Sequence, residues 1–405
     1  MKVLITTDLY KPQVNGVVTS VVNLYESLKA MGVEVKILTL SRSRRSYKEG
    51  DIYYVSSFPV GFYPDIRASF SIKNKCIKEL IKWRPDIIHT QCEFSTMNFA
   101  KIISIRTKAP MVHTYHTMYE HYLRYALKSA ATEKAGKTFV GVLLKKWLKA
   151  FEYIITPTEK VKENLKNYGF TNPMVVIPTG INLSKFNQEF TEEDKMNLRR
   201  EMGINPSDKI LLSLGRVAKE KNIEKIINHF IEFKKSHKGF SLVVAGGGPM
   251  VEELIERYSG EDKIYFTGMI SPDQVYKYYK LSDIFVCASQ SETQGLTYVE
   301  ALANGLPILC KYDNCLDGML EPGYNGYFID SYKDFEDKIT YLTSNPDLLI
   351  EMSENALKSS KIYGEEEFAK SVYGLYSKVI KNFKYVSLKS RPIRKVKSII
   401  RTYLD

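Results

Sequence analysis

The 405-residue sequence predicts an α/β protein with two doubly wound domains. Short, nearly continuous apolar runs alternate with amphipathic helical patterns, which is typical of parallel sheets covered on both faces by helices. The alternation stops in a polar segment around residues 186–207 and then starts again. A chain of this length is also too long for one ordinary core. We therefore expect two parallel sheets, with a ligand held between the domains at the carboxyl ends of the strands.

The expected first domain covers residues 1–187. Its strands are the runs VLIT (3–6), VEVKILTL (33–40), PDIIHT (85–90), PMVHTYHT (110–117), FEYIITPT (151–158) and PMVVIPTG (173–180). The second domain is expected over residues 188–375. Its strands are the runs KILLSLGRV (209–217), SLVVAGGG (241–248), KIYFTGM (263–269), DIFVCAS (283–289) and LPILCKY (306–312). Residues 376–405 are expected to form a helix and a basic amphipathic tail.

Composition narrows the class of protein. The formal charge of +12, from 58 basic and 46 acidic residues, favours a nucleic acid, an anionic membrane surface or a phosphorylated ligand as partner, or simply a soluble basic protein. Five cysteines without a CxxC pair indicate reduced thiols. No apolar run is long enough to span a bilayer, and the amino terminus is too short an apolar stretch for a signal peptide. We therefore expect a cytoplasmic protein.

Two common nucleotide motifs are missing from the sequence. The glycines at 246–248 do not continue into GxGxxG, and no lysine completes a Walker A loop. A dehydrogenase or a phosphate-hydrolysing enzyme is therefore disfavoured. No Asp-x-Asp metal motif occurs either.

The stretch SETQGLTYVEALANGLPIL (291–309) carries two glutamates eight positions apart. It follows an expected strand, so Glu292 is expected in the loop at the strand's carboxyl end and Glu300 in the following helix. The free amides near Gly295 and Leu296 would form the positive end of that helix, which suits a pyrophosphate. Carboxylates on both sides of a phosphate can accept hydrogen bonds from a sugar and a ribose. The alternative is a pair of solvated surface carboxylates.

The motif Glu292-x₇-Glu300, with Gly295-Leu296 inside it, resembles the signature of retaining glycosyltransferases of family 4, which have the GT-B fold. Gly215-Arg216 and Glu220-Lys221 resemble the phosphate-binding segment of that family. AGGGP (245–249), IPTGIN (177–182) and Asn325-Gly326 resemble its structural turns, so the resemblance covers nearly the whole chain. It implies two Rossmann-like domains that face each other across a cleft.

The resemblance also implies roles for single residues. Arg216 and Lys221 would neutralise the leaving diphosphate, Glu292 would hold the donor sugar, and Glu300 would hold the ribose. Thr293 would contact the donor, and the amides of Gly295 and Leu296 would bind its phosphate. No divalent ion is expected as a cofactor, because cationic side chains and helix dipoles replace it. The nucleotide's own phosphate would accept the proton of the incoming hydroxyl, and the sugar would be transferred with retention.

In the first domain, Gly16 matches a glycine of the family's donor loop, although this chain has Asn15-Gly16 where the family usually has two glycines. The alternative for this segment is a simple turn. His113 and His116 lie three positions apart on an expected strand, so they point to opposite faces and do not share a metal. His113 is expected in the core. His116 matches the family histidine beside the reacting sugar.

The segments SETQGLTYVEA, NGVVTSVVNL and VHTYHTMYEHY look most like bacterial diacylglycerol α-glucosyltransferases. This resemblance implies UDP-glucose as donor, a lipid acceptor and a peripheral position on the inner face of the cell membrane. The alternative acceptors are a polysaccharide, a polyprenyl-linked sugar or an already glycosylated lipid. Tyr119, Tyr122 and Tyr125 either line an acceptor site or pack in the core.

Two segments favour contact with an anionic membrane. Residues 138–151 place apolar residues on one helical face and Lys145, Lys146 and Lys149 on the other, with Trp147 at the apolar face. A core-facing helix with solvated lysines explains the pattern equally well. The tail carries basic residues that include Arg394, Lys395, Lys397 and Arg401, or it is simply solvated. A nucleic-acid partner is disfavoured, because the basic residues are not interleaved with stacking aromatics on an exposed sheet.

Overall fold

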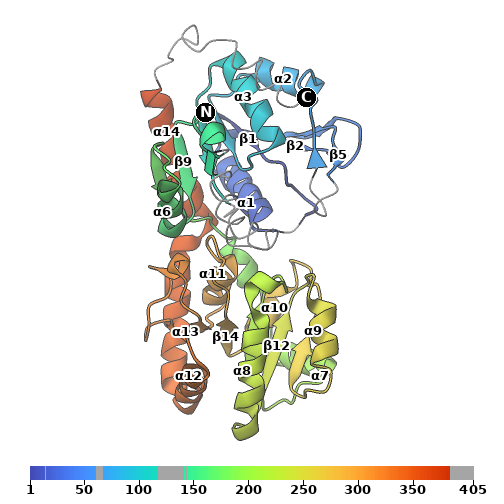
Figure 1. Cartoon of the computed structure of the whole chain (residues 1–405), viewed down its shortest axis with the longest axis vertical. Coiled ribbons are helices and arrows are strands. Elements are labelled where there is room, and N and C mark those ends of the chain that lie inside the picture. Colours follow the sequence, from blue (N-terminus) through green and yellow to red (C-terminus); the bar gives the residue numbers. More distant parts are fainter. Residues whose placement is uncertain (14, 61–66, 117–140, 143, 384–405) are drawn as a thin grey trace.

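The computed structural model describes residues 1–13, 15–60, 67–116, 141–142 and 144–383. These residues form two lobes, each built on its own sheet with helices on both faces (Figure 1). The two lobes follow each other in the sequence, except at the carboxyl end, where the last described helix returns to the first lobe. The two-sheet α/β architecture expected from the sequence is confirmed.

The sheet of the first lobe has eight strands in the order β10-β9-β8-β7-β1-β2-β4-β3, and only β3 pairs antiparallel. The strands are β1 (Lys2–Thr6), β2 (Glu34–Leu40), β3 (Tyr47–Glu49), β4 (Ile52–Val55), β7 (Ile87–Thr90), β8 (Met111–Thr114), β9 (Tyr153–Thr156) and β10 (Met174–Val176). The short strands β5 (Phe58–Pro59) and β6 (Arg67–Ala68) pair separately. All six runs expected as strands lie in this sheet.

The helices of the first lobe are α1 (Gly16–Ala30), α2 (Lys75–Trp83), α3 (Ser95–Thr107) and α6 (Glu159–Asn167). Alternate residues of β1 enter different cores: Leu4 packs with residues of α2, α3 and α6, whereas Val3 and Ile5 pack with residues of α1. Because both faces of the sheet are covered, its central strands are buried, whereas the edge strand β3 is exposed.

The sheet of the second lobe has six parallel strands in the order β13-β12-β11-β14-β15-β16. They are β11 (Lys209–Leu214), β12 (Phe240–Ala245), β13 (Ile264–Phe266), β14 (Ile284–Cys287), β15 (Ile308–Cys310) and β16 (Gly326–Phe328). The helices are α7 (Glu192–Met202), α8 (Ile223–Ser236), α9 (Val251–Arg257), α10 (Val275–Leu281), α11 (Leu296–Ala303), α12 (Tyr332–Ser344) and α13 (Pro346–Ser360). Four 3₁₀ turns are η1 (Leu183–Phe186), η2 (Lys219–Lys221), η3 (Asn314–Leu316) and η4 (Lys361–Tyr363).

Helix α14 (Glu365–Asn382), drawn in red in Figure 1, runs from the second lobe along the first. Its buried residues pack in the same core as β1 and α1; they are Phe368, Ala369, Val372, Leu375, Tyr376 and Val379. The expected domain boundary at residue 375 therefore falls inside one continuous helix, which belongs by its contacts to the first lobe.

The chain crosses between the lobes twice, and the two crossings touch each other. Ile181 donates its N–H to the carbonyl of Tyr363 over 2.8 Å and accepts from the N–H of Glu365 over 2.9 Å. A β-carbon at Gly180 would lie 2.6 Å from the β-carbon of Phe368, so a side chain has no room at this position. The crossings form one paired strand-like connection.

Strand order reverses beside the first strand of each sheet. In the first lobe β1 lies between β7 and β2, and in the second lobe β11 lies between β12 and β14. Loops that leave such adjacent strands diverge to opposite faces and open a crevice at the carboxyl ends of the strands. The loops after β1, β7, β11 and β14 are therefore the ones that the fold offers for binding.

Several expectations about the periphery can be compared with the structure. Leu144, Leu148 and Phe151 are buried in the core of the first lobe, so the apolar face of this segment packs against protein, as the core-facing interpretation held. Trp147 is half-buried beside Phe94, and Lys145, Lys146 and Lys149 are exposed. Tyr119, Tyr122, Tyr125 and the tail residues Arg394, Lys395, Lys397 and Arg401 lie outside the described residues.

All five cysteines are free thiols, as expected, and four of them are buried. None of the helices within the described ranges is long and apolar enough to cross a membrane.

Candidate active site

The loop after β14 carries Glu292 and leads into helix α11. Gly295 begins this helix with a φ of 75°, and a β-carbon here would lie 2.4 Å from the Tyr298 ring, so only glycine fits. No side chain of the described residues caps the helix, so the amides of Leu296 and Thr297 have no capping side chain. The positive end of the helix lies directly beside Glu292, because a β-carbon at Gly295 would be 3.5 Å from the Glu292 γ-carbon.

Lys221 and Glu292 form the central ion pair of this site. The Lys221 ammonium lies 2.5 Å from a carboxylate oxygen of Glu292. Burial alone would lower the pKa of Lys221, but the charge of Glu292 and the hydrogen bond outweigh it and raise the pKa above its ordinary value. Ser291 donates its hydroxyl to the carbonyl of Glu220 over 3.1 Å, which holds the loop against the turn that carries Lys221. The structure thus brings two predicted residues into direct contact.

Glu300 lies in helix α11, further along the chain than Glu292 and Leu296, and its carboxyl group contacts the buried Tyr279. Tyr279, which is fully buried, donates its hydroxyl to Glu300 over 2.9 Å. Burial raises the pKa of Glu300 to about 7, although the Tyr279 hydrogen bond and the charge of Lys185 both lower it. A carboxyl group with this pKa changes charge near neutrality.

The loop that carries Arg216 lies beside the start of helix α11. A β-carbon on Gly215 would lie 3.8 Å from the Thr297 methyl group. The chain of the AGGGP segment passes directly over this loop: a β-carbon at Gly246 would lie 2.0 Å from the Gly215 carbonyl oxygen. The glycine at 246 therefore allows close backbone packing that fixes the loop. Arg216 itself is exposed.

The donor loop expected in the first lobe reaches the second lobe. A β-carbon on Gly16 would lie 3.6 Å from a methyl carbon of Leu296, in ordinary van der Waals contact. Asn15 caps helix α1 by accepting the N–H of Val18 over 3.0 Å, which places Gly16 at the first position of that helix. Two helix N-termini, one from each lobe, thus meet at Gly16 and Leu296.

His116 follows β8 and belongs to a network of buried polar groups. Its Nε2 lies 2.7 Å from the side-chain oxygen Oε1 of Gln91, which only accepts, so Nε2 carries the proton. Burial and the nearby His113 lower the pKa of His116 to about 3, so the ring is neutral at pH 7. Gln91 also contacts His89 over 3.1 Å, and His89 contacts the Tyr376 hydroxyl over 2.6 Å. The ring of His116 is therefore oriented from helix α14.

His113 is fully buried, as expected, and contacts Thr90 over 2.7 Å and Glu93 over 3.3 Å. The network around it was not anticipated from the sequence. The sequence does contain an indication of this network. Polar residues, among them Gln91 and Glu93, directly follow the strand at 87–90, and polar side chains at the end of a buried strand often serve a site.

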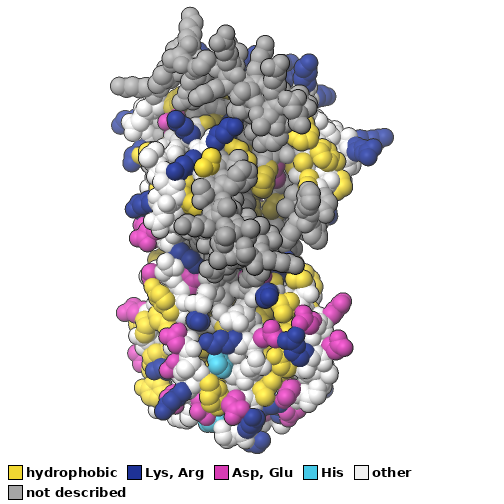
Figure 2. Space-filling model, in the orientation of Figure 1, with side chains coloured by type: hydrophobic (Ala, Val, Ile, Leu, Met, Phe, Trp, Pro, Cys, Tyr) yellow, Lys and Arg dark blue, Asp and Glu magenta, His cyan; other side chains and the backbone are white. Residues whose placement is uncertain are grey.

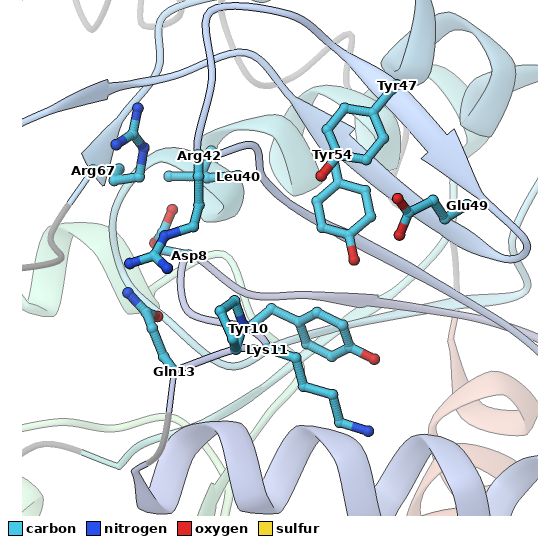
Figure 3. A pocket seen from close by; sticks show the side chains of 11 residues that line it. Asp8, Tyr10, Lys11, Gln13, Leu40, Arg42, Tyr47, Glu49, Tyr54 and Arg67 are labelled. Carbon is cyan, nitrogen blue, oxygen red and sulfur yellow. The ribbon is translucent and has the colours of Figure 1, made fainter.

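A polar pocket lies at the carboxyl ends of β1 and β2 in the first lobe (Figure 3). Asp8, Arg42 and Gln13 converge on one side of this pocket, and Tyr10, Tyr47 and Tyr54 line the other. One oxygen of Asp8 accepts the N–H of Thr96 over 2.9 Å, whereas the other is buried and has no hydrogen-bond partner among the described residues. Burial raises the pKa of Asp8 to about 7. The sequence interpretation missed this residue.

The structure brings several of the predicted residues together: Lys221 pairs with Glu292, Gly16 lies against Leu296, and the loop of Arg216 lies beside the start of helix α11. Glu292, Thr293, Gly295, Leu296 and Glu300 lie on one loop and helix; Arg216 and Lys221 follow β11; Gly16 and His116 come from the first lobe. Within the described part of the chain, no group of three His, Cys, Asp or Glu residues is placed to hold a metal ion.

Comparison with known proteins agrees with this arrangement. Residues 14–185 match the family described as Glycosyltransferase Family 4, and residues 194–359 match Glycosyl transferases group 1. The alpha-monoglucosyldiacylglycerol synthase of Acholeplasma laidlawii is 32% identical over 96% of this chain and 100% of its own. The chain belongs to the family 4 glycosyltransferases. The alpha-monoglucosyldiacylglycerol synthase of Streptococcus pneumoniae is 35% identical over 93% of this glycosyltransferase and 85% of its own chain.

Solved structures show that the glycosyltransferase has the GT-B fold. Sucrose-phosphate synthase from Thermosynechococcus elongatus superposes with a TM-score of 0.71 over 94% of this chain and 100% of that one, at 17% identity. The Anabaena protein HepE, in complex with UDP and glucose, gives a TM-score of 0.71 over 93% and 100%, at 15% identity.

The ion pair of this glycosyltransferase generates a prediction. Glu292→Ala and Lys221→Ala each remove one partner, and we expect the rate of sugar transfer to fall by a factor on the order of 10² to 10³, as for other lost transition-state contacts. The measurement is steady-state turnover, with circular dichroism to check folding. Lys225→Ala, on the neighbouring helix α8, is the matched control and should keep its rate. A folded Glu292→Ala or Lys221→Ala variant with wild-type turnover would contradict the assigned role.

Proposed function

We propose that this enzyme transfers an α-glucosyl group from UDP-glucose to 1,2-diacylglycerol, with retention, and thereby forms monoglucosyldiacylglycerol. The observation that carries the proposal is the identity of 32% and 35% to two alpha-monoglucosyldiacylglycerol synthases along nearly the whole chain. The Lys221–Glu292 pair at the start of helix α11 supplies the chemistry that such a transfer requires.

The donor diphosphate binds at the start of helix α11, where the amides near Leu296 and the charges of Lys221 and Arg216 neutralise it. Lys221 exchanges its contact with Glu292 for the phosphate, and Glu292 then accepts hydrogen bonds from the sugar hydroxyls. Glu300 accepts hydrogen bonds from the ribose. These cationic groups take the place of a divalent ion, so transfer needs no metal cofactor.

The acceptor approaches from the first lobe. The neutral ring or the carbonyl of His116 orients the primary hydroxyl of the sugar, while the diphosphate takes the proton from the incoming hydroxyl as the new glycosidic bond forms and the bond to the diphosphate breaks. The pocket around Asp8 supports an acceptor site on this lobe, because its unpaired carboxylate oxygen can accept a hydroxyl hydrogen bond.

The reaction takes place on the inner face of the cell membrane, to which the first lobe binds peripherally. Lys145, Lys146 and Lys149 are exposed on this lobe. Figure 2 shows that, on the visible face, Lys and Arg outnumber acidic side chains on the described surface of the upper lobe, whereas both signs mix on the lower lobe. Such a surface attracts anionic headgroups.

The decisive experiment incubates purified protein with radiolabelled UDP-glucose, UDP-galactose or GDP-mannose and with diacylglycerol in mixed micelles. We expect label in monoglucosyldiacylglycerol from UDP-glucose alone, with α configuration by nuclear magnetic resonance. Micelles without diacylglycerol are the control. Label that appears only when a polyprenyl-linked sugar, a polysaccharide or a glycosylated lipid is added would overturn the proposed acceptor.

Glu300 makes donor affinity depend on pH. Its pKa of about 7 leaves the carboxyl group protonated at pH 6 and ionised at pH 8, and only the ionised form offers both oxygens to the ribose. We expect the affinity for UDP-glucose, measured by calorimetry, to rise roughly tenfold between pH 6 and pH 8. The reason is that only about a tenth of the Glu300 carboxyl groups are ionised at pH 6, whereas about nine-tenths are ionised at pH 8. Glu300→Gln should bind more weakly and lose this dependence. A flat profile for the wild-type enzyme would refute the assignment.

Membrane binding should follow charge. We expect the protein to co-sediment with vesicles that contain phosphatidylglycerol and not with phosphatidylcholine vesicles, and added salt should weaken the binding. Each basic residue near anionic lipid contributes about 1 kcal/mol, so changing Lys145, Lys146 and Lys149 to Gln should lower the partition coefficient at least tenfold. Removing residues 384–405 should also lower it.

The matched control changes three exposed lysines of the second lobe, Lys333, Lys358 and Lys361, to Gln. Equal losses in both triple variants would mean that net charge, rather than the face of the first lobe, governs binding. Unchanged partitioning after truncation would remove the tail from the membrane contact.

A further inference from the structure

The loop that carries Glu292 belongs to the second lobe, yet residues of the first lobe hold three consecutive residues of it. Lys160 donates to the carbonyl of Glu292 over 3.0 Å, and Thr158 donates its hydroxyl to the carbonyl of Thr293 over 2.8 Å. The Gln294 side chain accepts the N–H of Thr179 over 2.8 Å and donates to its carbonyl over 2.9 Å. The backbone position of this loop is therefore set from across the junction.

Lys160, near the start of helix α6, also forms an ion pair with the second lobe. Its ammonium lies 2.6 and 2.7 Å from the two carboxylate oxygens of Asp313. The side chains are only 10% and 2% exposed, so solvent screens the pair weakly. Asp313 is fixed in turn, because it accepts the N–H of Cys315 over 2.9 Å and begins the turn η3.

We propose that Lys160 and Asp313 are positioning residues for sugar transfer: they hold Glu292 at the geometry that the donor sugar requires and connect that geometry to the placement of the first lobe. We call Thr158, Lys160, Thr179, Gln294 and Asp313 the interlobe clamp. The Lys160 ammonium group of the first lobe contacts both the Glu292 carbonyl and the Asp313 carboxylate of the second lobe. A shift of helix α6 relative to η3 therefore displaces the loop that carries Glu292.

The nucleotide part of the site does not share this dependence. Glu300 is held by Tyr279, and the Arg216 loop is packed under Gly246, both within the second lobe. Loss of the Lys160–Asp313 pair therefore affects Glu292, which contacts the hexose, whereas the two hydrogen bonds between Gln294 and Thr179 still hold the residue that precedes the phosphate-binding amides. A loss of kcat without a loss of UDP affinity therefore separates a positioning role from a general role in folding. The positioning role rests on the proposed transfer from UDP-glucose.

The test compares Lys160→Met, Asp313→Asn and the double variant Lys160→Met/Asp313→Asn with the wild-type enzyme. We expect kcat for glucosyl transfer to fall at least tenfold in all three, while the affinity for UDP stays within twofold. Each single variant leaves a buried group without its partner and should have a lower Tm, whereas the double variant removes both charges and should regain most of it. Activity should not return with stability.

Lys162→Met on the same helix is the matched control, because Lys162 pairs with Glu159 over 2.9 Å, and its hydrogen bonds and ion pair among the described residues stay within the first lobe. Recovery of kcat in the double variant, or a loss of UDP affinity that parallels the loss of kcat, would overturn the proposal and leave the pair a structural one. If the single variants do not fold, the double variant alone decides between these outcomes. Wild-type turnover of UDP-glucose in the same assay tests the proposed function separately.

Discussion

Parallel pairing is the constraint on which this architecture depends. Because parallel strands all end at the same edge, each sheet delivers its loops to one side, and the reversals of strand order at β1 and β11 open that side. The two sheets turn these edges toward each other, so that Gly16 meets Leu296 across the junction. Every residue assigned to the transfer lies on a loop, or on the helix turn that follows it, at one of these strand ends.

Charge is distributed unevenly within the site. Lys221 and the start of helix α11 provide positive potential where, in the proposed transfer, a diphosphate would bind, and Glu292 balances the charge of Lys221. His116 stays neutral because burial and a neighbouring histidine disfavour its charged form. In the proposed transfer, a neutral ring beside the sugar would add no repulsion toward a cationic transition state, whereas a protonated ring would.

Most strands of the two sheets were predictable, because each is a short apolar run that can be recognised locally; the short strands β3, β4 and β16 were not among the expected runs. Lys221 and Glu292 were singled out because their segments resemble motifs of the family 4 glycosyltransferases, and both segments follow strand ends. Lys160 and Asp313, by contrast, are 153 positions apart, and His89 and Tyr376 are 287 apart. No local pattern announces such pairs, because only the packing of complete lobes brings them together. Residues 144–151 illustrate the converse, since an amphipathic pattern alone does not say whether protein or lipid covers its apolar face.

The return of helix α14 has a consequence for how the protein is divided. Its apolar face completes the core over β1, and its Tyr376 contacts His89, which is linked to His116 through Gln91. A first lobe expressed without helix α14 would lose part of the cover of its sheet. A second lobe expressed together with this helix would expose the apolar face of the helix to solvent. Although the two halves match separate sequence families, neither half is structurally complete without the other, because the C-terminal helix completes the N-terminal lobe.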